Sequence, residues 1–274
     1  MIKFKNVWFR YDDEYILKDI NLEIKEGELI CILGDNGAGK TTFAKHLNGL
    51  LKPSKGDVII DGMNTKDTPV SELSKKVALV FQYPEKMFFT SSLTEEVSFA
   101  LRNFGFDDRV IEHQVEKVLK MFWLWDYRDR SPFTLSGGEQ RRLALAIVLA
   151  WDPKYIVMDE PTAGQDAFQR EMLLGAIREF TMRGKTIILI THDIEFVFEF
   201  HSRIILIDKG RIVFDGRSTE LFNEKPELLR KAGLDIPFSI KLKQVLSEKG
   251  KHFTFETLDD TVNKIYSLLR GENV

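Results

Sequence analysis

The amino-acid sequence predicts an α/β fold built around a phosphate-binding loop. Three observations predict it. β-rich runs alternate with segments of helical period along the 274 residues, the glycine-rich segment GDNGAGKTT occupies residues 34–42, and an apolar run at residues 155–158 ends in two acids. With 43% hydrophobic and 30% charged residues, the chain has the composition of a globular protein that folds.

Short runs rich in β-branched and aromatic residues predict the strands. They span residues 2–9, 29–33, 58–60, 77–81, 155–158, 186–190, 204–207 and 211–214. After Lys40, an apolar stripe at i, i+4, i+7 and i+8 predicts a helix that ends near Pro53, and it consists of Phe43, Leu47, Leu50 and Leu51. The glycine-rich segment therefore separates a predicted strand from a predicted helix.

Two further regions are predicted to be helical. The strand signal fades between Pro84 and Pro153, where residues 95–103, 110–123 and 139–151 carry helical spacing. This predicts a helical subdomain, about residues 84–153, inserted into a domain of residues 1–222. Residues 223–274 are predicted to form a C-terminal helical extension. Its two apolar stripes are Phe238, Leu242, Val245 and Leu246, and then Val262, Ile265 and Leu269.

Charge and composition exclude several classes of protein. The net charge is −3 with both signs interspersed, so the chain lacks the basic stripe that a nucleic-acid partner would require. The best apolar run, residues 143–150, is less than half of the roughly 20 residues that a spanning helix needs. No signal peptide precedes the first predicted strand, and the single cysteine, Cys31, lies in an apolar stretch. We expect a reducing, cytoplasmic setting in which Cys31 is a core residue rather than a reactive thiol.

The glycine-rich segment has the pattern of a phosphate-binding P-loop. Gly34, Gly39, Lys40 and Thr41 match G-x-x-x-x-G-K-[ST]. Glycines let backbone N–H groups converge on phosphate oxygens, and the lysine adds a point charge near the β- and γ-phosphates. The residues predicted to bind ATP here are Asn36, Gly37, Ala38, Gly39, Lys40, Thr41 and Thr42. Thr41 is also a predicted Mg²⁺ ligand.

Asp159 and Glu160 follow a strand that is predicted to be buried, and they lie at the edge of the sheet where α/β proteins bind ligands. Asp159 suits a ligand of Mg²⁺, and Glu160 suits the group that polarises the attacking water. Alone, an Asp-Glu pair after an apolar run is equally typical of a surface turn. Together with the P-loop, it predicts hydrolysis of the nucleotide.

A second anion-binding helix start occurs at LSGGE, residues 135–139, where Ser136, Gly137 and Gly138 open a predicted helix. Because one ATP needs only one P-loop, this second site is predicted to serve the nucleotide of another subunit. An ordinary N-cap followed by flexible glycines is the alternative interpretation.

These motifs together resemble the nucleotide-binding subunits of ABC transporters over about residues 2–222. The resemblance implies a P-loop NTPase core of ABC ATPase type with an antiparallel N-terminal β-subdomain and the helical insertion. It also implies that Tyr11 stacks on adenine, that Gln82 contributes to catalysis and Mg²⁺ binding, and that His192 contacts the γ-phosphate. Asp166 would lie in the loop that crosses to the partner. Taken singly, Tyr11 could equally be a surface aromatic, Gln82 a solvated strand end and His192 a helix N-terminal residue.

Within that family, residues 81–105, the segment RSPFTLSGG and the segment AGLDIP resemble the ATPase subunits of energy-coupling factor transporters, which import vitamins or transition-metal ions. That resemblance implies a membrane-embedded coupling subunit, a substrate-binding membrane subunit and a peripheral position at the cytoplasmic face of the cell membrane. It also implies that the C-terminal extension helps to join two ATPases. Packing on the chain's own core would produce the same apolar stripes.

Two departures from the family pattern bear on the partner ATPase. Glu139 stands where the signature segment usually has glutamine, and Gln165 stands where the crossing loop usually has leucine. Both favour a heterodimer with a related ATPase over a homodimer.

Two alternative functions are a soluble ABC ATPase that acts in ribosome remodelling or DNA repair, and a protein that binds ATP without hydrolysing it. The single P-loop and the lack of a basic patch or coiled-coil insertion argue against the first. The presence of Glu160 and His192 argues against the second.

Overall fold

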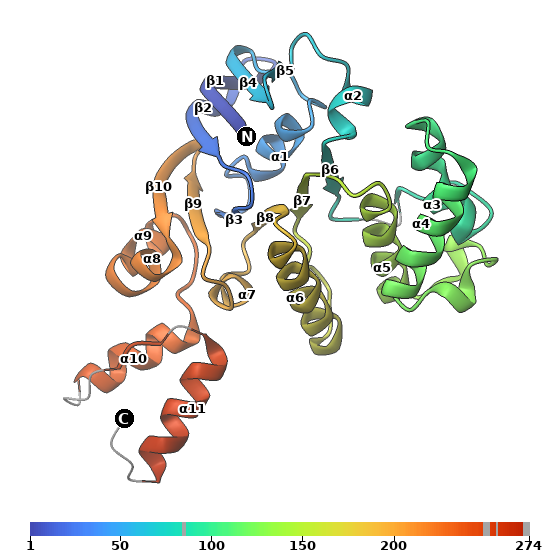
Figure 1. Ribbon diagram of the computed structural model, residues 1–274. Coiled ribbons are helices and arrows are strands. Elements are labelled where there is room, and N and C mark those ends of the chain that lie inside the picture. The colour runs from blue at the N-terminus through green and yellow to red at the C-terminus, as the bar shows by residue number, and fades with distance from the viewer. Residues whose placement is uncertain (84–85, 249–252, 256, 271–274) are drawn as a thin grey trace.

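The computed structural model describes residues 1–83, 86–248, 253–255 and 257–270 (Figure 1). It contains two sheets. The four-stranded antiparallel sheet has the order β2-β1-β4-β5 and consists of β1 (Ile2–Tyr11), β2 (Glu14–Ile24), β4 (Lys55–Ile60) and β5 (Met63–Asn64). The six-stranded sheet has the order β10-β9-β3-β8-β7-β6 and consists of β3 (Leu29–Leu33), β6 (Val77–Val80), β7 (Tyr155–Asp159), β8 (Thr186–Thr191), β9 (Arg203–Asp208) and β10 (Arg211–Arg217). Its strands are parallel except for β10, which pairs antiparallel with β9. The predicted α/β class with an antiparallel N-terminal sheet is confirmed.

Strand β2 is not among the predicted strands. Its buried side chains, Leu17, Ile20, Leu22 and Ile24, do not alternate regularly, because the register with β1 shifts along the strand. Asp19 within it has a left-handed backbone, with φ of 55°. An irregularity of this kind interrupts the period of two that identifies a strand in a sequence.

Helix α1 (Lys40–Leu47) lies between the two sheets, and it contacts β2 and β4 on one side and β7 and β8 on the other. The ring of its Phe43 stacks on Phe4 of β1, with centroids 4.5 Å apart. The helix ends at Leu47 rather than near Pro53, because Gly49 follows with φ of 74° and stops it. Leu50 is consequently 45% exposed and is not part of the buried stripe.

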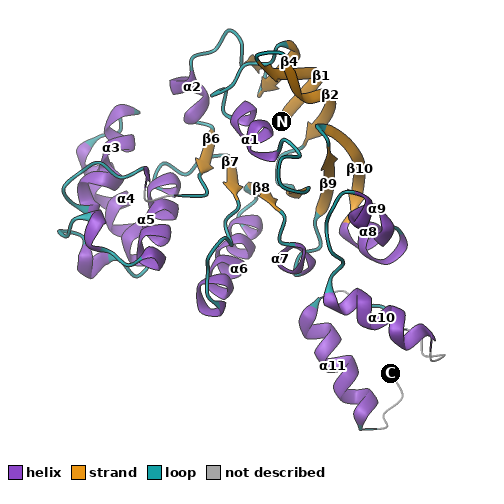
Figure 2. Ribbon diagram, turned by 180° about the vertical axis from the view of Figure 1, so that it is seen from behind, coloured by secondary structure: helices purple, strands orange, loops and turns teal. Residues whose placement is uncertain are grey.

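The predicted helical region beyond β6 is confirmed as three helices, α3 (Leu93–Asn103), α4 (Asp108–Met121) and α5 (Gly137–Leu149). Two 3-10 turns, η2 (Trp125–Tyr127) and η3 (Pro132–Thr134), connect α4 to α5. Figures 1 and 2 show these helices gathered beside β6, away from the antiparallel sheet. Pro84 and Glu85, where the insertion is predicted to begin, lie outside the described residues.

The remaining helices are α2 (Val70–Ser74), α6 (Ala167–Met182), α7 (Ile194–Phe198), α8 (Ser218–Glu224), α9 (Pro226–Lys231), α10 (Phe238–Glu248) and α11 (Leu258–Leu269). The last two are the helices of the predicted C-terminal extension, and they project from the end of the molecule opposite α3 and α4 (Figure 1). Phe255, between them, is fully buried and belongs to the same core cluster as Ile240 and Phe196. The extension therefore packs partly on the chain's own core.

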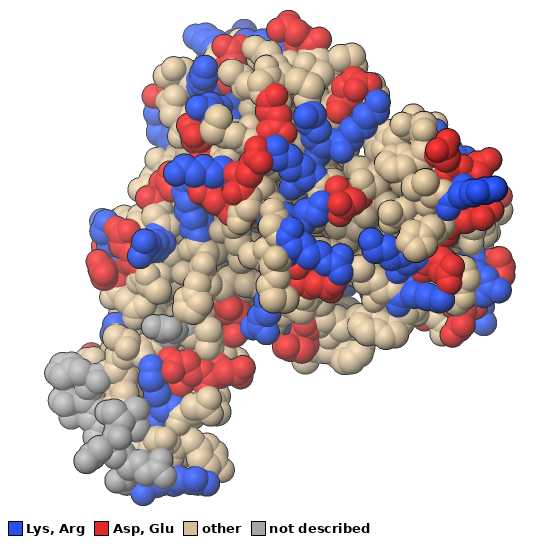
Figure 3. Space-filling model, in the orientation of Figure 1, with Lys and Arg blue, Asp and Glu red and all other residues tan. Residues whose placement is uncertain are grey.

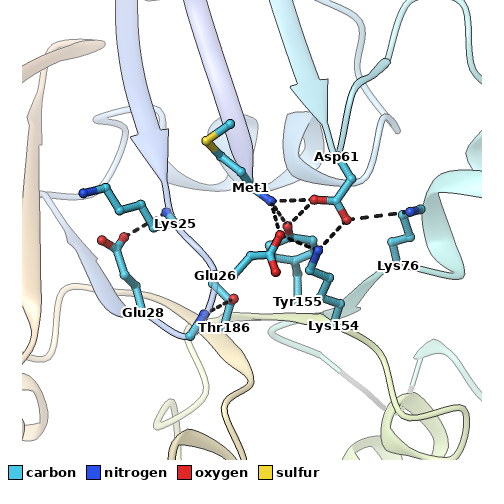
Figure 4. Close-up of polar contacts among 10 residues, drawn as sticks. Met1, Lys25, Glu26, Glu28, Asp61, Lys76, Lys154, Tyr155 and Thr186 are labelled. Carbon is cyan, nitrogen blue, oxygen red and sulfur yellow. Dashed lines mark hydrogen bonds and ion pairs between the residues drawn. The ribbon is translucent and has the colours of Figure 1, made fainter.

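A polar cluster joins the two sheets where their edges meet (Figure 4). Asp61, in the turn after β4, accepts hydrogen bonds from the Tyr155 hydroxyl at 2.6 Å and the Lys154 ammonium at 2.9 Å. The N-terminal ammonium of Met1 also donates to Asp61 and Tyr155. These contacts hold the pKa of Asp61 well below its usual value against the opposing effect of burial. The cluster fixes the antiparallel sheet to the start of β7.

Cys31 is fully buried in β3, and burial raises the pKa of its thiol to about 12, so its predicted role as a core residue is confirmed. Acidic and basic side chains are interspersed over the face shown in Figure 3. Within the described part of the chain, no helix combines the length and the apolar character that crossing a membrane demands.

Candidate nucleotide-binding and catalytic site

The phosphate loop connects the end of β3 to the start of α1, as predicted. Gly39, at the N-cap of α1, has φ of 102°, and a Cβ there would lie 3.1 Å from the Ile16 carbonyl oxygen. A Cβ on Gly34 would lie 2.4 Å from the Ile207 carbonyl oxygen of β9. Both positions therefore require glycine. No side chain caps α1, and its first turn has no acidic residue, so its N-terminal N–H groups are available to an anion.

Lys40 lies folded against its own loop. Its ammonium donates to the carbonyl oxygens of Gly34 at 2.8 Å and Asp35 at 3.1 Å, and it is 3.7 Å from Glu160 Oε1. The side chain is only 7% exposed. A buried ammonium with this arrangement supplies a fixed positive charge at the start of α1.

Asp159 ends β7 and is 4% exposed. Burial raises the pKa of its carboxyl group, the charge of Glu160 adds to that rise, and a hydrogen bond from the Thr41 hydroxyl opposes it. Its Oδ1 atom is buried and has no hydrogen-bond partner. An unpartnered carboxylate oxygen beside a threonine hydroxyl is a donor set that fits Mg²⁺, which prefers oxygen ligands.

Glu160 is held from three sides. Its Oε2 atom accepts a hydrogen bond from the Thr191 hydroxyl at 2.8 Å, and its Oε1 atom lies 2.8 Å from Nδ1 of His192 and near Lys40. Its backbone has φ of 48°, a left-handed conformation that costs a non-glycine residue about 1–3 kcal/mol. The backbone N–H of Glu160 donates to the Ile190 carbonyl of β8 at 2.7 Å, which holds this conformation in place. Thr191 was not predicted, although it ends a strand directly before His192.

A cavity of about 300 Å³ brings most of the predicted residues together. Its lining comprises Tyr11, Ile16, Asn36, Gly37, Gly39, Lys40, Thr41, Thr42, Gln82, Glu160 and His192. Tyr11 is 46% exposed, and its ring meets Phe9 edge to face at 4.8 Å. Ala38 is buried and is not part of the lining. Ile16 is a lining residue that the sequence analysis missed, since nothing in the sequence distinguishes it from a core residue of β2.

Ser136, Gly137 and Gly138 do not line this cavity; they begin α5, in the helical region. Ser136 is the N-cap of α5, because its hydroxyl accepts from the Glu139 N–H at 3.4 Å while its own N–H donates to Glu139 Oε2 at 2.8 Å. The Ser136 hydroxyl also donates to Glu139 Oε2 at 2.7 Å, and these bonds lower the pKa of Glu139. This helix start is therefore set apart from the chain's own phosphate loop.

The loop between β7 and α6 packs against this second helix start. Asp166 caps α6 by accepting from the Gln169 N–H at 2.8 Å, and Arg141 of α5 donates to the Gly164 carbonyl at 3.0 Å. A Cβ on Gly138 would lie 2.2 Å from the side-chain nitrogen of Gln169. The predicted crossing loop and the signature segment thus form one surface.

Comparisons with known proteins agree with this geometry. The family model described as ABC transporter matches residues 17–163. A putative ABC transporter ATP-binding protein of Pyrococcus abyssi is 46% identical over 90% of this chain and 94% of its own length. An energy-coupling factor transporter ATP-binding protein of Clostridium perfringens is 40% identical over 95% of this chain and 94% of its own length.

Solved structures give the same result. CbiO1 of Clostridium perfringens, part of the ABC transporter complex CbiONQ, aligns with a TM-score of 0.75 at 34% identity over 89% of this chain and 98% of that one. A dimeric ATP-binding cassette in a post-hydrolysis state with ADP and Pi aligns with a TM-score of 0.71 at 32% identity over 79% of this chain and 98% of that one. With a P-loop, a glutamate and a histidine at one cavity, the chain belongs to the ABC transporter family and is an ATP-binding, ATP-hydrolysing subunit of it.

Proposed function

We propose that this chain powers an energy-coupling factor importer of a vitamin or transition-metal ion from the cytoplasmic face of the membrane. The observation that carries the proposal is the separation of two helix starts that each suit a phosphate. The chain's own cavity holds the P-loop with Glu160 and His192, whereas Ser136 lies outside that cavity. The printed names of the relatives supply the transporter type.

In the proposed site, Tyr11 stacks on adenine, and the loop N–H groups of residues 36–42 bind the phosphates. Lys40 exchanges its contacts with the loop carbonyls for the β- and γ-phosphates, which are stronger acceptors. Thr41, Gln82 and Asp159 would hold Mg²⁺, which when bound neutralises charge on the β- and γ-phosphates.

Glu160 accepts the proton in this proposal, and His192 positions its carboxylate. Glu160 orients a water toward the γ-phosphate and accepts its proton at the carboxylate. The 2.8 Å contact with Nδ1 of His192 fixes the carboxylate and leaves the other edge of the imidazole to contact the γ-phosphate. The bond from the Thr191 hydroxyl prevents the carboxylate from rotating away.

We further propose that a related ATPase completes the site in trans. Its signature segment would cover the nucleotide bound here, while Ser136, Gly137 and Gly138 of this chain would cover the partner's. Loss of the γ-phosphate would let the pair open, and the helical insertion would pass this motion to a membrane-embedded coupling subunit. We also propose that residues 1–222 form the nucleotide-binding domain and that residues 223–274 form a C-terminal helical extension.

Affinity purification of the tagged chain from detergent-solubilised membranes tests the assignment. We expect a second ATPase, a membrane-embedded coupling subunit and a substrate-binding membrane subunit to co-purify. Recovery of the chain with ATPase activity but with no membrane protein would overturn the transporter proposal and favour an ABC ATPase that is not coupled to transport.

A further inference from the structure

Helix α7 begins directly after His192 and Asp193, and Asp193 fixes its first turn. Asp193 caps the helix by accepting from the Phe196 N–H at 3.0 Å, and its carboxylate also accepts two hydrogen bonds from Arg170, at 2.7 and 3.1 Å. The guanidinium of Arg170 lies over the Phe196 ring at 5.3 Å. Because the residue after His192 is held so tightly to the first turn of α7, a displacement of the histidine must be transmitted to the helix.

Two carboxylates of this segment reach the C-terminal extension. Glu195 Oε1 accepts a hydrogen bond from the Phe238 N–H at 2.7 Å, and Glu199 Oε1 accepts one from the Leu258 N–H at 3.2 Å. Phe238 and Leu258 are the first residues of α10 and α11, whose leading N–H groups have no partner within their own helix. A carboxylate at a helix N-terminus also interacts favourably with the helix dipole. The partial burial of Glu199 raises the pKa of its carboxyl group.

The two helices of the extension are joined to each other. The Thr261 hydroxyl of α11 donates to the Ser239 hydroxyl of α10 at 2.8 Å, and both residues are buried. Ahead of α10, Gly233 passes so close to the phosphate loop that a Cβ on it would lie 2.6 Å from Asp35 Oδ2. The extension therefore meets the nucleotide site at two places, through α7 and through Asp35.

We infer that Glu195 and Glu199 are positioning residues that set the C-terminal extension according to whether a γ-phosphate occupies the chain's own site. A γ-phosphate that engages His192 fixes α7, and α7 then holds the first turns of α10 and α11 through these two carboxylates. Loss of the γ-phosphate loosens both helices together. This inference rests on the proposed contact between His192 and the γ-phosphate, and it needs no membrane subunit.

Amide hydrogen exchange of the full chain tests the link with two nucleotides that differ at the γ-position, Mg·ADP and the non-hydrolysable analogue Mg·AMPPNP. The measurement is made at a concentration where sedimentation shows a monomer, so that contacts with a second subunit do not contribute to the difference. In the wild type we expect exchange in α10 and α11 to be at least about fivefold slower with AMPPNP, the lower end of typical coupling between sites. Glu195→Ala with Glu199→Ala should abolish this difference without changing the protection of the phosphate loop.

Three further variants identify which groups cause the difference in exchange between the two nucleotides. Glu195→Gln with Glu199→Gln keeps a side-chain oxygen that accepts from each N–H, and it should retain the difference. Lys264→Ala breaks a contact of α11 with the Thr254 carbonyl and a contact within α11 with Asp260, but it leaves both links to α7, so it should also retain the difference. His192→Ala should abolish it while AMPPNP still protects the loop.

The contrary results distinguish failure of the carboxylate link from failure of the role of His192. If the difference persists in the Glu195→Ala, Glu199→Ala variant, or is absent from the wild type, the inference is wrong. If it persists in His192→Ala alone, the proposed role of His192 fails and the carboxylate link stands.

Discussion

Glu160 occupies a strained backbone position, and four groups from two segments of the chain converge on it: Lys40, the Thr191 hydroxyl and both the N–H and the ring of His192. Such a side chain has little freedom to turn, so its carboxylate is oriented for a water before any nucleotide binds. This differs from a surface glutamate, which would lose considerable side-chain entropy on reaching the same orientation.

Replacing Glu160 with Gln tests this role. The amide keeps the size and the hydrogen bond from Thr191 but cannot accept a proton at neutral pH, so turnover should fall by roughly 100-fold or more. Binding of a fluorescent ATP analogue should persist, since the P-loop is intact. Steady-state ATPase assays provide the measurement, and Glu28→Gln, a change outside the cavity, is the matched control. Undiminished turnover in Glu160→Gln would remove this residue from the mechanism.

His46 makes stability depend on pH. Burial lowers the pKa of its imidazole from 6.5 to about 4, although the contact between Nδ1 and the Thr42 carbonyl raises it. Between pH 6.5 and 4 the unfolded chain binds a proton that the folded chain does not, so stability is complete above pH 6.5 and falls as the pH decreases, by up to about 3 kcal/mol.

Urea denaturation of the wild type and of His46→Leu at several pH values measures this contribution. The unfolding free energy of the leucine variant should fall less between pH 6.5 and 4 than that of the wild type. Parallel pH profiles would show that His46 does not titrate in this way.

At the scale of single elements, the turn at Gly233 holds the start of the extension against the phosphate loop. Gly233 has φ of 78°, and an added Cβ would approach Asp35. We expect Gly233→Ala to lower the unfolding free energy by about 1–2 kcal/mol, the cost of a left-handed backbone at a residue other than glycine.

Gly175 gives a matched control for this substitution. It lies inside α6, its φ is not positive, and a Cβ there would meet nothing within 4 Å. Gly175→Ala should therefore raise stability by about 0.5–1 kcal/mol. Thermal denaturation in the absence of nucleotide compares the two variants. Equal effects of the same sign would contradict the strained turn at Gly233.

Local patterns predicted most of the elements but missed others, among them β2 and α6. Strands buried on both faces, such as β7 and β8, are continuous apolar runs in the sequence and were predicted. Strand β2 was missed because of the irregularity at Asp19, and α6 was not predicted although Leu173, Ile177 and Phe180 have helical spacing and are buried. The motif residues of the cavity were predicted because each stands at a strand or helix end with a distinctive sequence.

Contacts between distant segments could not be predicted in the same way. Glu195 and Glu199 lie 43 and 59 residues before the N–H groups that they bind, and no local period links such positions. The same holds for the orphaned oxygen of Asp159, which depends on the approach of α1 to β7. Side-chain chemistry can be inferred from sequence, but its partners require the three-dimensional arrangement.

At the scale of the whole molecule, α11 presents an apolar surface. Val262 is 53% exposed and Tyr266 is 59% exposed, and they are one helical turn apart, whereas Ile265 packs against the core cluster. Part of the apolar surface of α11 is therefore buried within the chain, and part faces outward.

We expect Val262→Lys with Tyr266→Lys to weaken association with the proposed partner ATPase by at least about tenfold in Kd, because two charges would have to be desolvated in the interface. Asn263→Lys, which adds a charge at another exposed position of the same helix, should leave association unchanged. Pull-down of co-expressed partner and sedimentation of the complex provide the readout. Wild-type association of the double variant would place the partner elsewhere on the chain.

The position of α1 between the two sheets has a consequence for the folding of the protein. Any opening of the phosphate loop must disturb the hydrophobic core that α1 shares with both sheets, so a nucleotide held at the N-terminus of α1 acts as a ligand of the native state as a whole. At a hundred times its dissociation constant, such a ligand adds about 2.7 kcal/mol to the free energy of global unfolding. A chain whose nucleotide supply fails should therefore lose resistance to proteolysis at the same time as it loses turnover.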